Sequence, residues 1–297
     1  MTRPRIGVFA DCTDISMPIL ELAVALEERG FEGLFLNEHT HLPVEAPRST
    51  FPAGGEIPER YARFWDPYVA LSFVAARTSL VVGPCVSLVA EHDAIALAKA
   101  IATLDVLSGG RVRLGVGFGW HREEFEDHGR GPASVRAAVV EETVALMKQL
   151  WTEDVASFSG EHLTLTPSRS WPKPLQSPHP PVLLGAPARP RTFDRVARWA
   201  DGWIPMGTPI FEPIVGVWMR DLHAACEAIG RDPSSCSVTC TLTAVPVTRL
   251  ADAVDRAAAH GMDWVLVKVG DQSAEAVLPK LDRIAAAVGL LPHPVFA

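Results

Sequence analysis

The chain has 297 residues, of which 48% are hydrophobic and 21% are charged, a composition typical of a globular protein with a large core. Its 27 basic and 35 acidic residues give a formal net charge of −8, which argues against nucleic-acid binding, because that function needs a basic face. No apolar run reaches the roughly 18 residues that span a bilayer, and Asp11 and Asp14 interrupt the N-terminus before a signal-peptide core can form.

Short β-branched runs alternate with Ala- and Leu-rich helical patterns along most of the chain. Most of the eight candidate strands are near-continuous apolar runs, which is typical of strands that are covered on both faces. In chain order, the predicted strands are Arg5–Ala10, Gly33–Asn37, Ser79–Gly83, Arg111–Gly117, Pro181–Gly185, Gly202–Pro205, Ser237–Ala244 and Asp263–Val269.

Helices are expected between these strands, and two of them have clear end signals. Asp66 is an N-cap residue followed by Pro67 at the first helical position. Asp93 caps a second helix, which ends before Gly109 and Gly110. The predicted helices are Ile15–Arg29, Pro67–Arg77, Ala94–Leu107, Ser134–Trp151, Thr192–Ala200, Glu212–Ile229, Leu250–His260 and Ala274–Val288.

Eight strand-then-helix units predict an α/β fold, a single (β/α)8 TIM barrel over residues 1–297. A doubly wound open sheet is the alternative, but such sheets seldom need eight parallel strands, and no Gly-x-Gly-x-x-Gly turn follows the first strand. Two connections are too long for ordinary loops, so insertion regions are expected after strands two and four, at about 41–65 and 151–181. A hairpin turning at Gly160 is expected in the second. Both insertions are expected to wall the pocket at the carboxyl ends of the strands.

Histidine side chains follow the second predicted strand. His39 is either a hydrogen-bonded structural residue or, at the pocket mouth, a group that exchanges a proton or binds a reactive ring nitrogen. His39 and His41 also have the spacing of two metal ligands. The later strands offer only Asp271 as a weak further ligand, and the five cysteines have no metal spacing, so no metal is expected.

Two other strand ends are rich in small residues. Gly115, Gly117 and Gly119 precede Trp120, and either mark a twisted strand or leave a shelf of bare backbone for a flat ring or a phosphate. The sequence Gly-Ala-Pro-Ala-Arg-Pro-Arg over 185–191 precedes a helix. It is either an anion site at a helix N-terminus or a plain turn with solvated arginines.

Taken together, these segments resemble the luciferase-like flavin and deazaflavin oxidoreductases, in particular the F420-dependent branch. The most specific stretch is LAKAIATLDVLSGGRVRLGVGFGWHREEF over 97–125, and the resemblance covers about residues 5–290. Further similar stretches are Leu150-Trp-Thr-Glu-Asp, Trp171-Pro-Lys-Pro-Leu-Gln and Ala200-Asp-Gly-Trp.

The resemblance implies a TIM barrel that holds coenzyme F420, or alternatively FMN, at the carboxyl ends of its strands. It implies that Glu38 and His39 flank the ring, with His39 as the active-site acid or base. The family's bulge after strand three, often with a non-proline cis peptide, corresponds to Cys85 and Val86. The remaining cofactor-binding residues that it implies are Gly117 and Phe118 after strand four, and Gly185, Ala186 and Pro187 in a phosphate loop.

Two departures from the family pattern narrow what the resemblance implies. Sugar-phosphate dehydrogenases of the family have a catalytic Glu where this chain has Trp120, so we do not expect that substrate. The Arg-rich turn of the family is altered over 128–137, which leaves the phosphate contacts of Arg130 and Arg136 open.

We therefore expect an enzyme that transfers a hydride between F420 and a small, apolar organic substrate. An FMN-dependent monooxygenase supplied by a separate flavin reductase is the first alternative, and a non-catalytic F420-binding barrel is the second. Trp65, Phe118 and Trp120 are expected on the substrate side, and the segment Val44–Pro58 is expected to be mobile and to order as a lid. A homodimer in a reducing cytoplasm is expected, with neither a nucleic-acid nor a membrane partner.

Overall fold

The strands of the computed structural model, which describes residues 3–292, pair in parallel to form one eight-stranded sheet. The strands lie side by side in the order β3-β2-β1-β10-β9-β8-β7-β4. Their bounds are β1 Arg5–Ala10, β2 Gly33–Leu36, β3 Val81–Pro84, β4 Leu114–Gly117, β7 Val182–Gly185, β8 Gly202–Ile204, β9 Ser237–Leu242 and β10 Trp264–Val269.

The two end strands of this sheet, β3 and β4, also bond to each other. The N–H of Ser87, just beyond β3, donates to the carbonyl oxygen of Gly115 at 2.8 Å, and the N–H of Gly117 donates to the carbonyl oxygen of Ser87 at 2.9 Å. A parallel bridge pairs Val82 with Val112. The sheet therefore closes into the (β/α)8 barrel that the sequence predicts, and not into a doubly wound open sheet.

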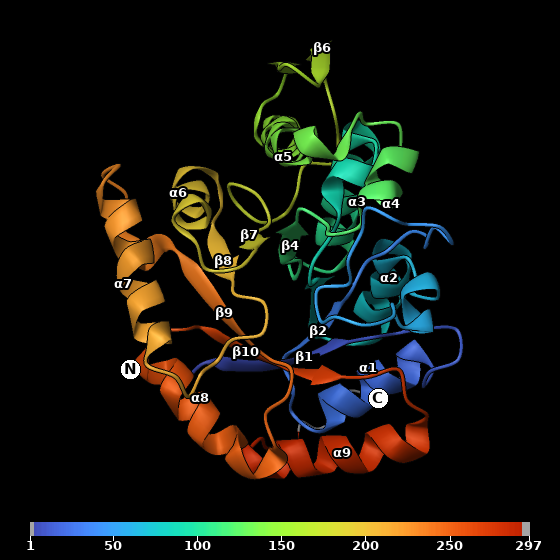
Figure 1. Cartoon of the computed structure of the whole chain (residues 1–297), viewed down its shortest axis with the longest axis vertical. Coiled ribbons are helices and arrows are strands. Elements are labelled where there is room, and N and C mark those ends of the chain that lie inside the picture. The colour runs from blue at the N-terminus through green and yellow to red at the C-terminus, as the bar shows by residue number, and fades with distance from the viewer. Residues whose placement is uncertain (1–2, 293–297) are drawn as a thin grey trace.

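Helices follow the strands and form the outer layer of the barrel (Figure 1). Two begin at the predicted caps, because Asp66 accepts a hydrogen bond from the N–H of Val69 and Asp93 accepts one from the N–H of Ala96, both at 2.8 Å. No helix within residues 3–292 is both long and apolar enough to cross a membrane. The helices between strands are α1 Ile19–Glu28, α2 Pro67–Arg77, α3 Ala94–Leu107, α5 Arg136–Thr152, α6 Pro190–Trp199, α7 Ile214–Glu227, α8 Leu250–Ala259 and α9 Ala274–Ala287.

The structure differs from the predicted helices most clearly at one helix start and at one additional helix. The first helix begins at Ile19 rather than Ile15, because Ser16 bonds to Thr13 in a turn and Pro18 precedes the first helical residue. A six-residue helix, α4 (Arg122–Asp127), follows β4 and was not predicted, because its sequence REEFED has a single apolar residue and no apolar period.

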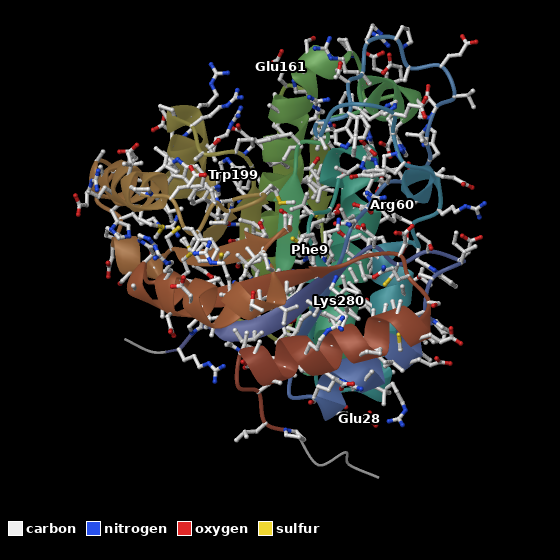
Figure 2. The ribbon with its side chains drawn as sticks, turned by 60° about the horizontal axis from the view of Figure 1, so that its bottom comes forward. Phe9, Glu28, Arg60, Glu161, Trp199 and Lys280 are labelled. Atoms are coloured by element: carbon white, nitrogen blue, oxygen red, sulfur yellow. The ribbon has the colours of Figure 1, made fainter. Side chains whose placement is uncertain are left out.

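Side chains that point into the barrel form an apolar plug. The register of β1 against β10 puts Phe9, Trp264 and Leu266 on the inner face, since alternate residues of a strand share one face. Figure 2 shows Phe9 at the centre of the molecule, with Glu28 and Glu161 near opposite edges. The plug consists of Phe9, Phe35, Val81, Cys85, Leu183, Ile204, Trp264 and Leu266. It fills the barrel beneath the carboxyl ends of the strands, where barrel enzymes carry their active sites.

The two long connections form the predicted insertion regions. The first carries a short 3-10 helix, Glu59–Ala62, and Phe64 of this insertion pairs with Thr13 beyond β1. The second contains an antiparallel hairpin of β5 (Ala156–Ser159) and β6 (Thr164–Ser168), which turns at Gly160 as predicted.

Candidate active site

His39 lies beyond the end of β2, and its side chain is only 7% exposed. Its Nδ1 is 2.6 Å from Oε2 of Glu124 in α4. The rings of Tyr61, Phe64 and Trp120 surround the imidazole, with centroids 5.1, 6.2 and 5.6 Å away. The insertion after β2 and the loop after β4 therefore cover this histidine at the rim of the barrel.

Glu38, the residue before His39, points the other way, into the segment that follows β3. Its Oε2 accepts hydrogen bonds from Ser87 Oγ at 2.7 Å and from the N–H of Leu88 at 2.5 Å. Its Oε1 lies 2.7 Å from Nε2 of His92. Glu38 thus anchors the residues that directly follow Val86.

Removing His92 is expected to destabilise the protein most between pH 4.5 and 6.5. Burial alone would raise the pKa of Glu38, but hydrogen bonds from His92, Ser87 and Leu88, with the charge of His92, hold it below 4.5. Burial alone would lower the pKa of His92, but Glu38 raises it above 6.5. The contribution of the pair is therefore lost as pH falls through the lowered pKa or rises through the raised one.

Urea unfolding of the wild type and of His92→Gln across this pH range measures the effect. We expect a loss of about 3 kcal/mol where both groups are charged, because the variant leaves a buried carboxylate without its charged partner, and a smaller loss as pH rises above 6.5. A loss that grows with rising pH would contradict the pairing.

Val86 lies where bare backbone was expected. A Cβ atom at Gly117 or Gly185 would come within 2.4 or 2.3 Å of a Val86 methyl group, so the two glycines make room for this side chain. The Cys85–Val86 peptide bond is cis. The glycine shelf is therefore covered by an isopropyl group, which offers an apolar surface near the carboxyl ends of β4 and β7.

Two other predicted residues turn their side chains away from the rim. The Cys85 side chain is fully buried in the barrel plug, and burial raises the pKa of its thiol to about 12. Phe118 is half-buried with the outer core, and the guanidinium of Arg195 in α6 lies 4.8 Å above its ring. The Cys85 thiol therefore packs in the plug, and the partly exposed Phe118 ring packs against Arg195 of α6.

The predicted phosphate loop leads into α6. Ala186 is buried, and its carbonyl oxygen accepts a hydrogen bond from Nε1 of Trp203 at 2.9 Å. No side chain caps the N-terminus of α6, and Arg189 and Arg191 beside it are exposed. The N–H of Ala186 donates to the carbonyl oxygen of Ile204 at 3.3 Å, and Pro187 and Pro190 have no N–H. Phosphate binding by Gly185, Ala186 and Pro187 therefore stays a prediction, which rests on the uncapped helix N-terminus that follows them.

Arg130 and Arg136 lie in the segment over 128–137, which departs from the family pattern, and both lie near other parts of this chain. Arg130 donates to the carbonyl oxygen of His92 at 2.5 Å. Arg136 begins α5 near Glu91, a carboxyl group whose pKa burial raises to about 9. Neither arginine belongs to the loop that precedes α6.

A polar cluster that sequence reasoning missed lies beside His39. Lys268 Nζ is 2.8 Å from Oδ1 of the buried Asp11, and Arg60 Nε is 3.2 Å from its Oδ2. Asn37, two residues before His39, also donates to Asp11. Alternation along β10 indicates that Lys268 shares the inner face with Trp264 and Leu266, and this signal could have found it.

The two histidines that have the spacing of metal ligands contact different carboxylates. His39 contacts Glu124, whereas His41 Nε2 lies 3.1 Å from Oδ2 of Asp127 at the surface. Within the described part of the chain, no group of three or more His, Cys, Asp or Glu residues could hold a metal ion.

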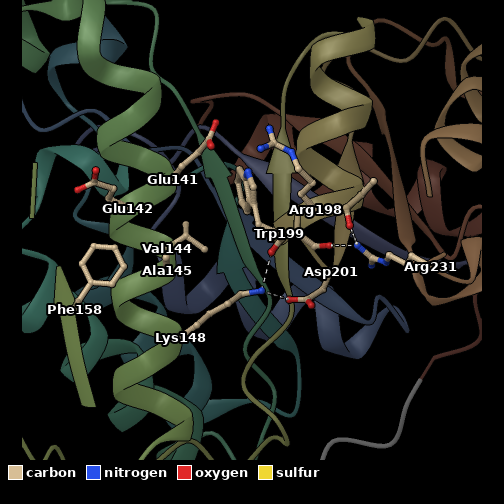
Figure 3. A pocket seen from close by; sticks show the side chains of 12 residues that line it. Glu141, Glu142, Val144, Ala145, Lys148, Phe158, Arg198, Trp199, Asp201 and Arg231 are labelled. Atoms are coloured by element: carbon tan, nitrogen blue, oxygen red, sulfur yellow. Dashed lines mark hydrogen bonds and ion pairs between the residues drawn. The ribbon is translucent and has the colours of Figure 1, made fainter. Parts of the chain in front are cut away.

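A cavity of about 620 Å³ lies on the outer wall, between α5 and α6, and is not part of this site (Figure 3). Lys148 crosses it, donating to the carbonyl oxygen of Trp199 at 2.7 Å and lying 3.7 Å from Asp201. None of the residues predicted for the active site lines it.

A family model described as luciferase-like monooxygenase matches residues 17–286. The chain belongs to this family. An uncharacterised Mycobacterium tuberculosis protein is 41% identical over 266 residues, which cover 88% of this chain and 90% of that protein. The family resemblance predicted from the sequence is therefore confirmed.

Members with established cofactors fall into two groups. An F420-dependent glucose-6-phosphate dehydrogenase of Amycolatopsis mediterranei is 32% identical, covering 63% of this chain and 52% of that enzyme. An FMNH2-dependent dimethylsulfone monooxygenase of Pseudomonas putida is 33% identical, covering 38% of this chain and 31% of that enzyme. The family thus includes both F420-dependent dehydrogenases and FMN-dependent monooxygenases.

Solved structures show the same fold. The monooxygenase RslO1 of Streptomyces bottropensis has a TM-score of 0.74 at 18% identity, covering 96% of this chain and 98% of its own. An F420-dependent secondary alcohol dehydrogenase in complex with an F420-acetone adduct has a TM-score of 0.73 at 17% identity, covering 97% and 99%.

Proposed function

We propose that this protein is an F420-dependent oxidoreductase that transfers a hydride between F420 and a small organic substrate. The observation that carries the proposal is the juxtaposition of two features at neighbouring strand ends. His39 lies at the rim beyond β2, and Val86 lies beyond the neighbouring strand β3. The Val86 side chain covers Gly117 and Gly185 at the ends of β4 and β7. An apolar surface beside a single imidazole suits a flat redox ring that needs both support and a proton partner.

The residues present fit such a cofactor. Val86 would support the ring, and Gly185, Ala186 and Pro187, with the uncapped N-terminus of α6, would hold the phosphate. F420 supplies a two-electron hydride carrier when it is bound. His39 would exchange the accompanying proton, and Glu38 would keep the segment of Val86 in place through Ser87 and Leu88.

The substrate side of the site would be aromatic and apolar. The rings of Phe51 and Tyr61 from the insertion lie 5.7 and 6.0 Å from Trp120. In α4, Glu126 pairs with Arg48 of the insertion at 2.5 Å, which holds this segment over the rim. Movement of the insertion would admit a substrate to His39, in keeping with the lid expected over Val44–Pro58.

The alternative is an FMN-dependent monooxygenase that receives reduced flavin from a separate reductase, which the Pseudomonas putida relative favours. Anaerobic mixing with reduced F420 and a panel of small carbonyl compounds tests the proposal, and mixing with reduced FMN in the presence of oxygen tests the alternative. Reoxidation of F420 by a panel compound supports the proposal. Oxygen-dependent turnover with reduced FMN alone would support the alternative, and no turnover with either cofactor would support a non-catalytic barrel.

We further propose that the protein is a homodimer and that it is cytoplasmic. Exposed apolar side chains gather on α2 and the residues beside it, with Trp65, Val69 and Phe73 exposed by 46%, 61% and 61%. A face of this kind is suited to a second copy of the chain. Sedimentation velocity measures the mass of the assembly in solution directly.

All five cysteines are buried free thiols, which suits a reducing compartment such as the proposed cytoplasm.

A further inference from the structure

Glu124 is fully buried, and both of its oxygens are bonded to the chain at the end of β2. Oε2 lies 2.6 Å from Nδ1 of His39, and Oε1 accepts the N–H of Thr40 at 2.9 Å. One carboxyl group therefore fixes both the imidazole and the backbone that carries it.

This contact determines which nitrogen of His39 carries hydrogen. An ionised carboxylate only accepts hydrogen bonds, so Nδ1 of His39 must donate to Glu124. Nε2 makes no hydrogen bond within residues 3–292, and it is the nitrogen that remains to exchange a proton.

In His121, which also contacts Glu124, the opposite ring nitrogen carries the hydrogen. Its Nδ1 accepts the backbone N–H of Glu124 at 3.2 Å, so its hydrogen must lie on Nε2. Burial lowers the pKa of His121, which keeps this ring neutral. His121 caps α4 and thereby helps to hold Glu124 against His39.

We propose that Glu124 is a positioning residue that keeps His39 in the Nδ1–H tautomer and makes Nε2 the atom that exchanges a proton in catalysis. This inference rests on the proposed function, because it takes His39 as the acid-base group. The charged or titratable groups about the ring are Glu124 and His121 at α4 and Tyr61 in the insertion.

Long-range proton–nitrogen NMR spectra of the ligand-free protein, labelled with ¹⁵N at histidine, test the inference. Signals of His39 are assigned through their absence in His39→Gln. We expect hydrogen on Nδ1 of His39 and on Nε2 of His121 in the wild type. In Glu124→Gln, a population with hydrogen on Nε2 of His39 is expected, because the amide group can also donate to Nδ1. Glu126→Gln, on the same helix but paired with Arg48, should match the wild type.

Hydrogen on Nε2 of wild-type His39, which is measured without any variant, would overturn the inference, as would a Glu124→Gln spectrum unchanged from wild type. With reduced F420 and a substrate from the carbonyl panel, Glu124→Gln should lower kcat by about 10²-fold, the lower end of what a positioned acid or base contributes, while KM changes little. Unchanged turnover in His39→Gln would remove His39 from the chemistry, whereas the absence of F420-dependent turnover in the wild type would overturn the proposed function, whatever tautomer the spectra report.

Discussion

Replacing His39 with Gln is expected to lower kcat by about 10²–10⁴-fold, the range that a positioned acid or base contributes. Glutamine keeps a similar size and a hydrogen-bonding end, but it cannot exchange a proton near neutral pH. The affinity for F420 should change little, because the predicted phosphate loop and Val86 lie on other strand ends. Stopped-flow measurement of hydride transfer under saturating F420 separates the two effects.

The matched control is His41→Gln. His41 lies two residues further along, is 41% exposed and pairs with Asp127 at the surface, so its replacement should leave kcat unchanged. A His39→Gln enzyme with wild-type kcat, or an equal loss in both variants, would remove His39 from the chemistry.

Replacing Gly83 with Ala is expected to destabilise the protein by at least about 3 kcal/mol, at the upper end of the cost of overpacking. A Cβ atom at Gly83 would lie 1.8 Å from the carbonyl oxygen of Arg113. That atom belongs to the backbone directly before β4, the strand that closes the barrel, where the N–H of Arg113 donates to the carbonyl oxygen of Val82 at 3.0 Å. Relief of the clash therefore requires β3 and β4 to separate. The free energy of unfolding in urea measures the loss.

Gly216→Ala in α7 serves as the control for Gly83→Ala. Its Cβ would meet only His260 Cε1, at 3.6 Å, and alanine favours a helix by about 0.5–1 kcal/mol over glycine. We expect this variant to be slightly more stable than the wild type. A Gly83→Ala protein as stable as the wild type would show that β3 and β4 do not close the barrel in solution.

Much of the fold could be predicted from the sequence because local residue patterns indicate where its strands and helices lie. Apolar runs such as Val182–Gly185 mark strands buried on both faces, and Asp66 and Asp93 mark helix starts. Helix α4 has no such pattern. Its side chains are held by contacts with the insertion after β2, which the sequence of α4 alone does not record.

The site could be predicted only in part, because its key contacts join distant segments. Glu124 meets His39 across 85 positions, and Lys268 meets Asp11 across 257. The resemblance of the sequence to the family indicated that Glu38 and His39 lie together beside the cofactor ring. Successive residues at a strand end face opposite ways, so one anchors the segment after β3 and the other meets the rim.

The proposed function requires above all that a flat redox cofactor lies at the barrel rim against Val86. Titration of the purified protein with F420 and with FMN, followed by quenching of tryptophan fluorescence and repeated with Val86→Asp, tests this directly. We predict that F420 binds with one equivalent per chain and more tightly than FMN, and that Val86→Asp weakens binding. Failure of both cofactors to bind, or equal binding by Val86→Asp, would contradict the account.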